Sequence, residues 1–373
     1  MSLLFRWGTY VLESGAGLDA MFKSHLGACR RDVRFITGRG FDPRMNLGLR
    51  MLLAAGGQGR RHITLLQFEE GSLSPSRRYQ HLIDQNIKDL NDLIHDPNAH
   101  ETKIVKMWSP DGRRISSRSA AEIFRSVNEF EGFTDIVLDV SSLPRSIFYP
   151  LMAKLLHLVE RGGRRINLFV IVAENPDLDK QIVDEGIDED ADYVHLFRSG
   201  AERMATAEEP NVWIPVLGEG QSVQLRRLHD LIMPAEICPL FPSPALNPRR
   251  ADDLVAEYQQ LLFDGFRVEP RNFIYASERN PFEVYRQVRQ TVLYYRAALL
   301  PLGGARAVIS SVSSKLLSIG SLLAAYELKQ ARHDVGIAHI EAQGYRLENE
   351  RVIMDLAPKS VLFGLWLLGE CYA

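Results

Sequence analysis

The stretch Asp135–Met152 constrains the fold of this chain most strongly. It reads as a short apolar strand, Ile136–Val140, a polar loop that ends at Pro144, and a helix from Ser146 onward. Free backbone N–H groups and the positive end of the helix dipole lie at such a helix start, so the loop suits an anion. The alternative is that Ser142 or Ser146 only caps the helix.

A second copy of this arrangement lies near the C-terminus. There the apolar strand Ala307–Ser310 is followed by S-V-S-S-K and by the helical pattern Leu316–Leu328. In both copies a serine lies two residues, and a cation six residues, after the same strand position: Ser141 and Arg145 after Asp139, and Ser311 and Lys315 after Ile309. Two serine-rich loops with a cation at the same offset predict an internal duplication.

Length and composition set the outer limits. A chain of 373 residues favours two domains, each large enough for its own core. Hydrophobic residues make up 46% and charged residues 24%, as in ordinary globular proteins. The net charge of −3 argues against bulk nucleic-acid binding and leaves room only for local basic patches.

The cysteines and the apolar runs indicate the compartment. Cys29, Cys238 and Cys371 have no metal-ligand spacing and suggest a reducing environment. The first residues lack an apolar region long enough for a signal peptide, and the longest apolar run, Val361–Gly369, is too short to span a bilayer. We therefore expect a cytoplasmic protein with no membrane partner.

Strands alternate with helices along most of the chain. The expected strands of the first copy are Val33–Thr37, Ile63–Phe68, Ile104–Trp108, Ile136–Val140 and Ile166–Ala173. Those of the second are Val212–Leu217, Ile237–Phe241, Phe273–Ala276, Ala307–Ser310 and Val335–Glu341. The other expected helices include Tyr79–Ile94, Ala120–Asn128, Ala251–Phe263 and Phe282–Ala298. This order predicts an α/β fold of two tandem Rossmann-like lobes, each a doubly wound, mainly parallel sheet.

The expected domains follow from this repeat. Residues 1–30 form an N-terminal extension, residues 31–205 the first lobe with an acidic linker, and residues 206–373 the second lobe. The linker assignment rests on Glu174–Glu209, which holds twelve acidic and three basic residues.

Candidate ligand residues gather where the strands end, because open α/β sheets bind ligands outside the carboxyl ends of their strands. Each copy has a Gly-x-Gly turn, a proline followed by two arginines, and a Ser-rich loop with a cation. In the first lobe the candidates are Gly38, Arg39, Gly40, Arg77, Arg78, Asp139, Ser141, Ser142 and Arg145. In the second they are Gly218, Gly220, Arg249, Arg250, Ser311, Ser313, Ser314 and Lys315.

The residue types in these loops favour a phosphate. Glycines let backbone amides approach a phosphate, and arginines donate paired hydrogen bonds to its oxygens. The alternative for the paired arginines is a solvated helix start. Neither Gly-x-Gly continues to the dinucleotide-binding motif, because Pro43 and Val223 stand at its last position. P-loop, zincin, hydrolase and CxxC motifs are missing, so we expect no metal or cofactor and assign no catalytic residue.

The spacing Asp139-x-Ser141-x-x-x-Arg145 resembles the [DN]-x-[ST]-x-x-x-[RK] signature of CRISPR-associated Rossmann fold (CARF) domains. The second copy keeps Ser311 and Lys315 but has Ile309 in place of the acid or amide. The resemblance covers residues 31–173 and 211–345. CARF domains and the related SAVED domains sense cyclic oligonucleotides, usually with a pair of Rossmann-like lobes.

The resemblance implies a sensor that binds a nucleotide or cyclic oligonucleotide between its two lobes in prokaryotic antiviral defence. The protein partners it implies are a separately encoded effector and a second copy of the chain. One alternative is a nucleotide-processing enzyme on the same scaffold, such as a cyclic-oligonucleotide phosphodiesterase. Another is a scaffold subunit of a larger complex.

Overall fold

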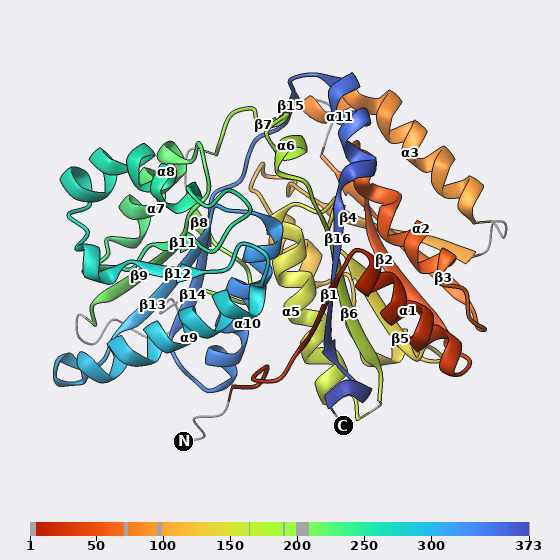
Figure 1. Cartoon of the computed structure of the whole chain (residues 1–373), viewed down its shortest axis with the longest axis horizontal. Coiled ribbons are helices and arrows are strands. Elements are labelled where there is room, and N and C mark those ends of the chain that lie inside the picture. Colours follow the sequence, from red (N-terminus) through yellow and green to blue (C-terminus); the bar gives the residue numbers. More distant parts are fainter. Residues whose placement is uncertain are drawn as a thin grey trace. The chain divides into compact units, whose positions relative to one another are not determined.

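The computed structural model describes residues 5–70, 74–94, 99–163, 165–188, 191–198 and 209–372. The chain divides into two compact units (Figure 1). The first lobe comprises Thr9–Gly186 and Ala342–Ala373. The second lobe comprises Ile187–Glu341 together with the N-terminal residues through Gly8.

The first lobe is built on a seven-stranded sheet in the order β1-β16-β6-β5-β2-β3-β4. Its strands are β1 (Val11–Ser14), β2 (Val33–Arg39), β3 (Arg61–Glu69), β4 (His100–Lys106), β5 (Asp135–Asp139), β6 (Asn167–Glu174) and β16 (Val361–Leu368). The five strands from β6 to β4 are parallel, whereas β16 is antiparallel to β6 and to β1. Two short strands, β7 (Ile182–Asp184) and β15 (Tyr345–Leu347), form a separate antiparallel pair.

Helices cover both faces of this sheet, as a doubly wound fold requires (Figure 1). They are α1 (Ala16–Ala28), α2 (Leu47–Ala54), α3 (Gln80–Leu93), α4 (Ser116–Ala121), α5 (Arg145–Arg161), α6 (Pro176–Asp179) and α11 (Glu350–Leu356). Side chains of α1, α2 and α3 form one apolar core with β2 and β5, which includes Phe22, Leu52, Leu90, Phe35 and Val137. The opposite face carries α5, whose central residues are almost all buried.

The second lobe repeats the parallel part of this topology. Its sheet has the order β12-β11-β9-β13-β14-β8, with β10 also paired to β9. The strands are β8 (Asp192–Tyr193), β9 (Asn211–Val216), β10 (Glu236–Ile237), β11 (Leu240–Pro242), β12 (Ile274–Ala276), β13 (Arg306–Ser311) and β14 (Val335–His339). Its helices are α7 (Ser222–Ile232), α8 (Arg250–Glu257), α9 (Pro281–Ala298) and α10 (Lys315–Gln330).

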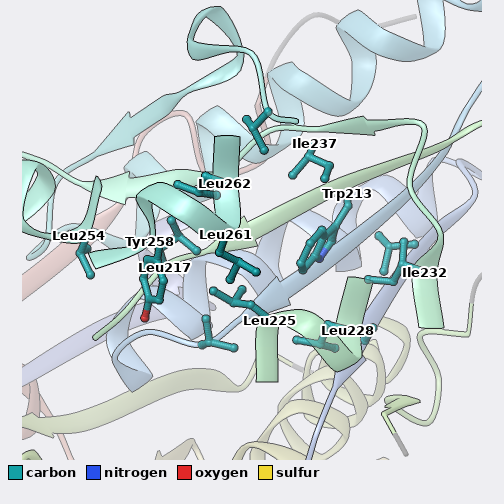
Figure 2. Close-up of a cluster of buried hydrophobic side chains, with 14 of the residues drawn as sticks. Trp213, Leu217, Leu225, Leu228, Ile232, Ile237, Leu254, Tyr258, Leu261 and Leu262 are labelled. Carbon is teal, nitrogen blue, oxygen red and sulfur yellow. The ribbon is translucent and has the colours of Figure 1, made fainter. Parts of the chain in front are cut away.

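Both lobes place their five parallel strands in the spatial order third, second, first, fourth, fifth. This is the strand order of Rossmann-like folds. The expected α/β class with two mainly parallel sheets is therefore confirmed. In the second lobe, side chains of α7 and α8 belong to one apolar core with Trp213 of β9, which is drawn in Figure 2.

Several expected elements differ in extent. The strand expected at Ile237–Phe241 is split into β10 and β11 at Pro239, which has no N–H to donate. The helix expected at Ala120–Asn128 is the short α4, which ends at Ala121. The strand expected at Ile104–Trp108 begins earlier and ends at Lys106 as β4, because the residues that follow fold into a hairpin.

The domain boundaries also differ from those expected. Residues 342–373 complete the first lobe rather than the second, because β16 pairs with β6 along its length. The expected N-terminal extension is divided between the lobes: β1 and α1 belong to the first, whereas Trp7 is buried against Tyr285 in the second. Residues 189–190 and 199–208 of the expected acidic linker lie outside the described residues.

The position of β16 generates a stability prediction. Leu365 is fully buried and pairs with Val170 of β6, so Leu365→Ala should lower the free energy of unfolding by about 2–5 kcal/mol. The matched control is Val361→Ala at the exposed start of the same strand, expected to cost about 0.5 kcal/mol or less. Urea denaturation measures both, and hydrogen–deuterium exchange should place the loss in β6. Equal effects of the two substitutions would contradict the conclusion that β16 is a buried strand of the first-lobe sheet.

Candidate functional site

The topological switch point of each lobe lies between its first and fourth parallel strands. In the first lobe these are β2 and β5, and in the second they are β9 and β13, which pair directly. The Gly-x-Gly motif lies at the end of the first of these strands, beginning within β2 in the first lobe and just after β9 in the second, and the Ser-rich loop follows the other strand. The two predicted motifs of each lobe are therefore adjacent at the edge where such sheets bind ligands.

The first glycine of each Gly-x-Gly turn packs against the Ser-rich loop of its own lobe. A Cβ added to Gly38 would lie 2.6 Å from Cδ2 of Leu143 and 3.2 Å from Oγ of Ser142. A Cβ added to Gly218 would lie 2.5 Å from the carbonyl oxygen of Val312 and 2.9 Å from Cα of Ser313. These contacts fall at the same offsets, three and four residues after Asp139 and after Ile309. The repeat seen in the sequence is thus also a repeat of contacts.

In the first lobe the acid and the first serine of the motif face inward. Asp139 is fully buried, and its Oδ1 accepts a hydrogen bond of 2.9 Å from the Ser141 amide. A Cβ added to Gly48, in the first turn of α2, would lie 2.3 Å from Oδ2 of Asp139. The buried hydroxyl of Ser141 accepts from the Ala173 amide at 2.9 Å. Both side chains therefore hold the loop in place.

Ser142 and Arg145 occupy the more accessible part of this loop. The Ser142 hydroxyl donates to the carbonyl oxygen of Gly38 at 2.9 Å and so ties the two loops together. Helix α5 begins at Arg145, which is partly buried. Within the described residues no side chain caps this helix, so the interpretation of Ser142 or Ser146 as its cap is wrong. The hydroxyl of Ser146, in the first turn, is buried without a hydrogen-bond partner in the described part of the chain.

The second lobe has the same layout with a different helix start. Helix α10 begins at Lys315, and the Ser314 hydroxyl caps it by accepting from the Leu317 amide at 3.3 Å. Ser311 is buried, and its hydroxyl lies 2.8 Å from that of Ser318. Ser313 is also buried. The cation is the first helical residue in both lobes, as the equal offsets in the sequence require.

Two side chains that the sequence reasoning did not identify hold the Gly-x-Gly turns. In the first lobe the buried Asn86 of α3 donates to the carbonyl oxygen of Gly40 at 2.9 Å. In the second, the hydroxyl of Tyr258, which follows α8, donates to the carbonyl oxygen of Gly218 and accepts from the Gln221 amide. Both residues lie in the helical segment that follows the second strand. No local motif marks them, because neither residue type nor spacing is shared.

The arginines of the first lobe differ in their surroundings. Arg39 donates to Gln67 of the neighbouring β3 at 2.9 Å. Arg77 is exposed, and Arg78 forms an ion pair with Glu185, close to β7. A role for Arg78 in ligand binding would require it to leave that carboxylate, so Arg77 is the better placed of the pair.

The arginines of the second lobe are likewise unequal. Arg250 forms ion pairs with Glu219, in the middle of the Gly-x-Gly turn, and with Glu278. Burial opposes its charge, but the hydrogen bonds and negative charges of these two glutamates raise its pKa overall. Arg249 is exposed and lies 4.0 Å from Asp253. Gly220 has a φ of +75°, which favours glycine, and its amide donates to Glu257. Arg250 therefore stabilises the turn through its ion pairs with Glu219 and Glu278.

Each lobe thus brings its Gly-x-Gly turn and its Ser-rich loop together and leaves a cation at the start of a long helix. Such a helix start attracts phosphate through the dipole and the first-turn amides, and the cation adds a charge-assisted hydrogen bond. In the described ranges no group of histidine, cysteine, aspartate and glutamate side chains is arranged to hold a metal ion. None of the described helices has both the length and the hydropathy of a membrane span.

Comparison with known proteins finds matches among solved structures only. No family model and no curated protein matches the sequence. A type III CRISPR defence DNA nuclease activated by cyclic oligoadenylate is similar at a TM-score of 0.46 and 10% identity, over 84% of this chain and 67% of that chain. A universal stress protein from Archaeoglobus fulgidus gives a TM-score of 0.22 and 9% identity, over 82% of this chain and 95% of that chain. These scores are low, and the function proposed below rests on the chain's own residues.

The glycine contacts predict which turn positions tolerate a side chain. Gly218→Ala should cost about 1–3 kcal/mol of unfolding free energy, because its Cβ would meet the backbone of Val312 and Ser313. The matched control is Gly40→Ala, whose Cβ would find no atom nearer than 3.8 Å. Chemical denaturation of the two variants and the parent protein checks this. A Gly40→Ala variant as unstable as Gly218→Ala would show that the contact with the Ser-rich loop is not the cause.

Proposed function

We propose that this protein is a sensor that binds a phosphate-bearing nucleotide at the switch points of its two Rossmann-like lobes. Cyclic oligonucleotides are the leading ligand class. One observation carries the proposal: in each lobe the motif cation is the first residue of a long helix that starts beside a glycine turn packed against the same loop. Such a sensor would act in prokaryotic antiviral defence through a separately encoded effector.

The physical basis is electrostatic and geometric. The N-terminus of a helix presents amide hydrogens and a partial positive charge to an anion. Arg145 and Lys315 add a full charge at that point. The second glycine of each turn leaves space beside the backbone, because a Cβ added to Gly40 would meet no atom nearer than 3.8 Å and one added to Gly220 none within 4 Å. Two such sites in one chain suit a ligand with several phosphates.

The positions of the acid and the serines favour sensing over catalysis. A general base must come within hydrogen-bond reach of the proton that it removes. Asp139, the only acid of the two Ser-containing strand-to-helix motifs, is fully buried and bonded to the Ser141 amide, and Ile309 takes its place in the second lobe. The buried hydroxyls of Ser141 and Ser311 bond within the protein. These groups hold the loops and are not directed at a ligand.

Substitution of the two cations tests the binding proposal. Arg145→Ala and Lys315→Ala should each weaken the best ligand by about 1.5–3 kcal/mol, or roughly 10- to 150-fold, the range for hydrogen bonds to charged groups. Ligands would be selected by thermal shift from mononucleotides and cyclic oligonucleotides, and affinities measured by calorimetry. The control is Arg161→Ala at the far end of α5. Unchanged affinity in both test variants, with the fold intact, would show that Arg145 and Lys315 do not bind the ligand.

A turnover assay separates the sensor from an enzyme. The parent protein should return its tightest ligand intact, or convert it only very slowly, because Asp139 is buried and Glu219 is paired with Arg250. Incubation with excess ligand followed by chromatography of the products measures this. Multiple turnovers that disappear in Arg145→Ala or Lys315→Ala would replace the sensor with a phosphodiesterase on the same scaffold.

A further inference from the structure

A short hairpin follows β4 at the edge of the first-lobe sheet. Trp108 forms an antiparallel bridge with Arg114, and the flanking hydrogen bonds run from the Ser109 amide to Arg113 and from the Ile115 amide to Met107. The Ser109 hydroxyl also accepts from the Arg113 amide at 3.0 Å. These bonds give the hairpin, residues 107–115, a defined backbone. Its side chains therefore form a preorganised surface.

The hairpin exposes an aromatic ring stacked on a cation. The guanidinium carbon of Arg114 lies 4.4 Å from the centroid of the Trp108 ring, yet the Trp108 residue remains 42% exposed. Ile104, four residues earlier on β4, is 56% exposed. Large aromatic side chains are normally buried, so an exposed tryptophan held in this way indicates a contact surface.

The same segment concentrates positive charge in an otherwise acidic chain. Residues 106–118 carry four cations and one acid, a local charge of +3 in a protein of net charge −3. Lys106 is exposed and forms no ion pair with any described residue. Arg113 is 84% exposed and pairs with Asp111, which is also exposed, so that pair contributes little stability and leaves the guanidinium available.

We propose that this basic aromatic hairpin, with the outer face of β4, binds single-stranded nucleic acid. A base stacks on Trp108, whose electron density Arg114 polarises, while Lys106 and Arg113 contact phosphates on either side. Exposed aromatic rings interleaved with cations are the means by which single strands are held without base reading. A duplex fits less well, because its bases are already stacked on each other. This site is separate from the switch-point loops and does not rest on the function proposed for them.

The test uses fluorescein-labelled oligothymidylate of about 12 nucleotides, within the range that single-strand modules occupy. Fluorescence anisotropy at salt concentrations from about 50 to 200 mM gives affinity and its salt dependence. Trp108→Ala should weaken binding about 5- to 100-fold at every salt concentration, the loss of one stacked base, without changing the salt slope. Arg113→Ala should reduce the slope of log affinity against log salt by about 0.7, the loss of one phosphate contact.

The matched control is Arg271→Ala in the second lobe. Arg271 is 80% exposed and pairs with an acid two residues earlier, Glu269, just as Arg113 pairs with Asp111. It should leave both affinity and slope unchanged. The proposal is overturned by absent binding at low salt, by equal affinity for a 12-base-pair duplex, or by a Trp108→Ala variant that binds normally. Equal affinity for labelled decaglutamate would instead assign the surface to an acidic protein segment.

Discussion

The contact between a glycine and a Ser-rich loop sets the geometry of both switch points. Gly38 lies near the end of β2 and Gly218 just after β9, and neither position leaves space for a side chain between the first parallel strand and the loop after the fourth. Because parallel neighbours lie only about 5 Å apart, the two loops meet where the strands end. The helix that follows must then start at this point, with Arg145 or Lys315 as its first residue.

Within this frame the motif residues have two kinds of role. Asp139, Ser141 and Ser311 are buried and bonded, so they hold the loops in shape. Hydrogen bonds in a low-dielectric interior stabilise a loop more than they do in water, and a buried acid is tolerated only when it is paired in this way. The departure at Ile309 is consistent with such a role, since an apolar residue can fill the same position where no acid is needed.

The two lobes reach similar turns by different side-chain interactions. In the first, the side-chain amide of Asn86 in α3 donates a hydrogen bond to the carbonyl oxygen of Gly40. In the second, Tyr258 holds the carbonyl of Gly218, and Arg250 links Glu219 to Glu278. A duplicated scaffold can thus keep its main-chain geometry while the supporting side chains diverge. The second lobe's turn carries its own acid, so the charge that each switch point presents to a ligand is not the same.

Local patterns in the chain were sufficient to predict the class of fold and the pairing of motifs. Alternating apolar strands and helices require a mainly parallel sheet, and equal offsets from Asp139 and Ile309 put Arg145 and Lys315 at matching helix starts. The pairing of β16 with β6, and the partners of Arg78 and Arg250, came only from the folded chain. These contacts join residues that are distant in sequence. Hydrophobic periodicity cannot predict them, because it indicates which face of an element is apolar and not which other element packs against that face.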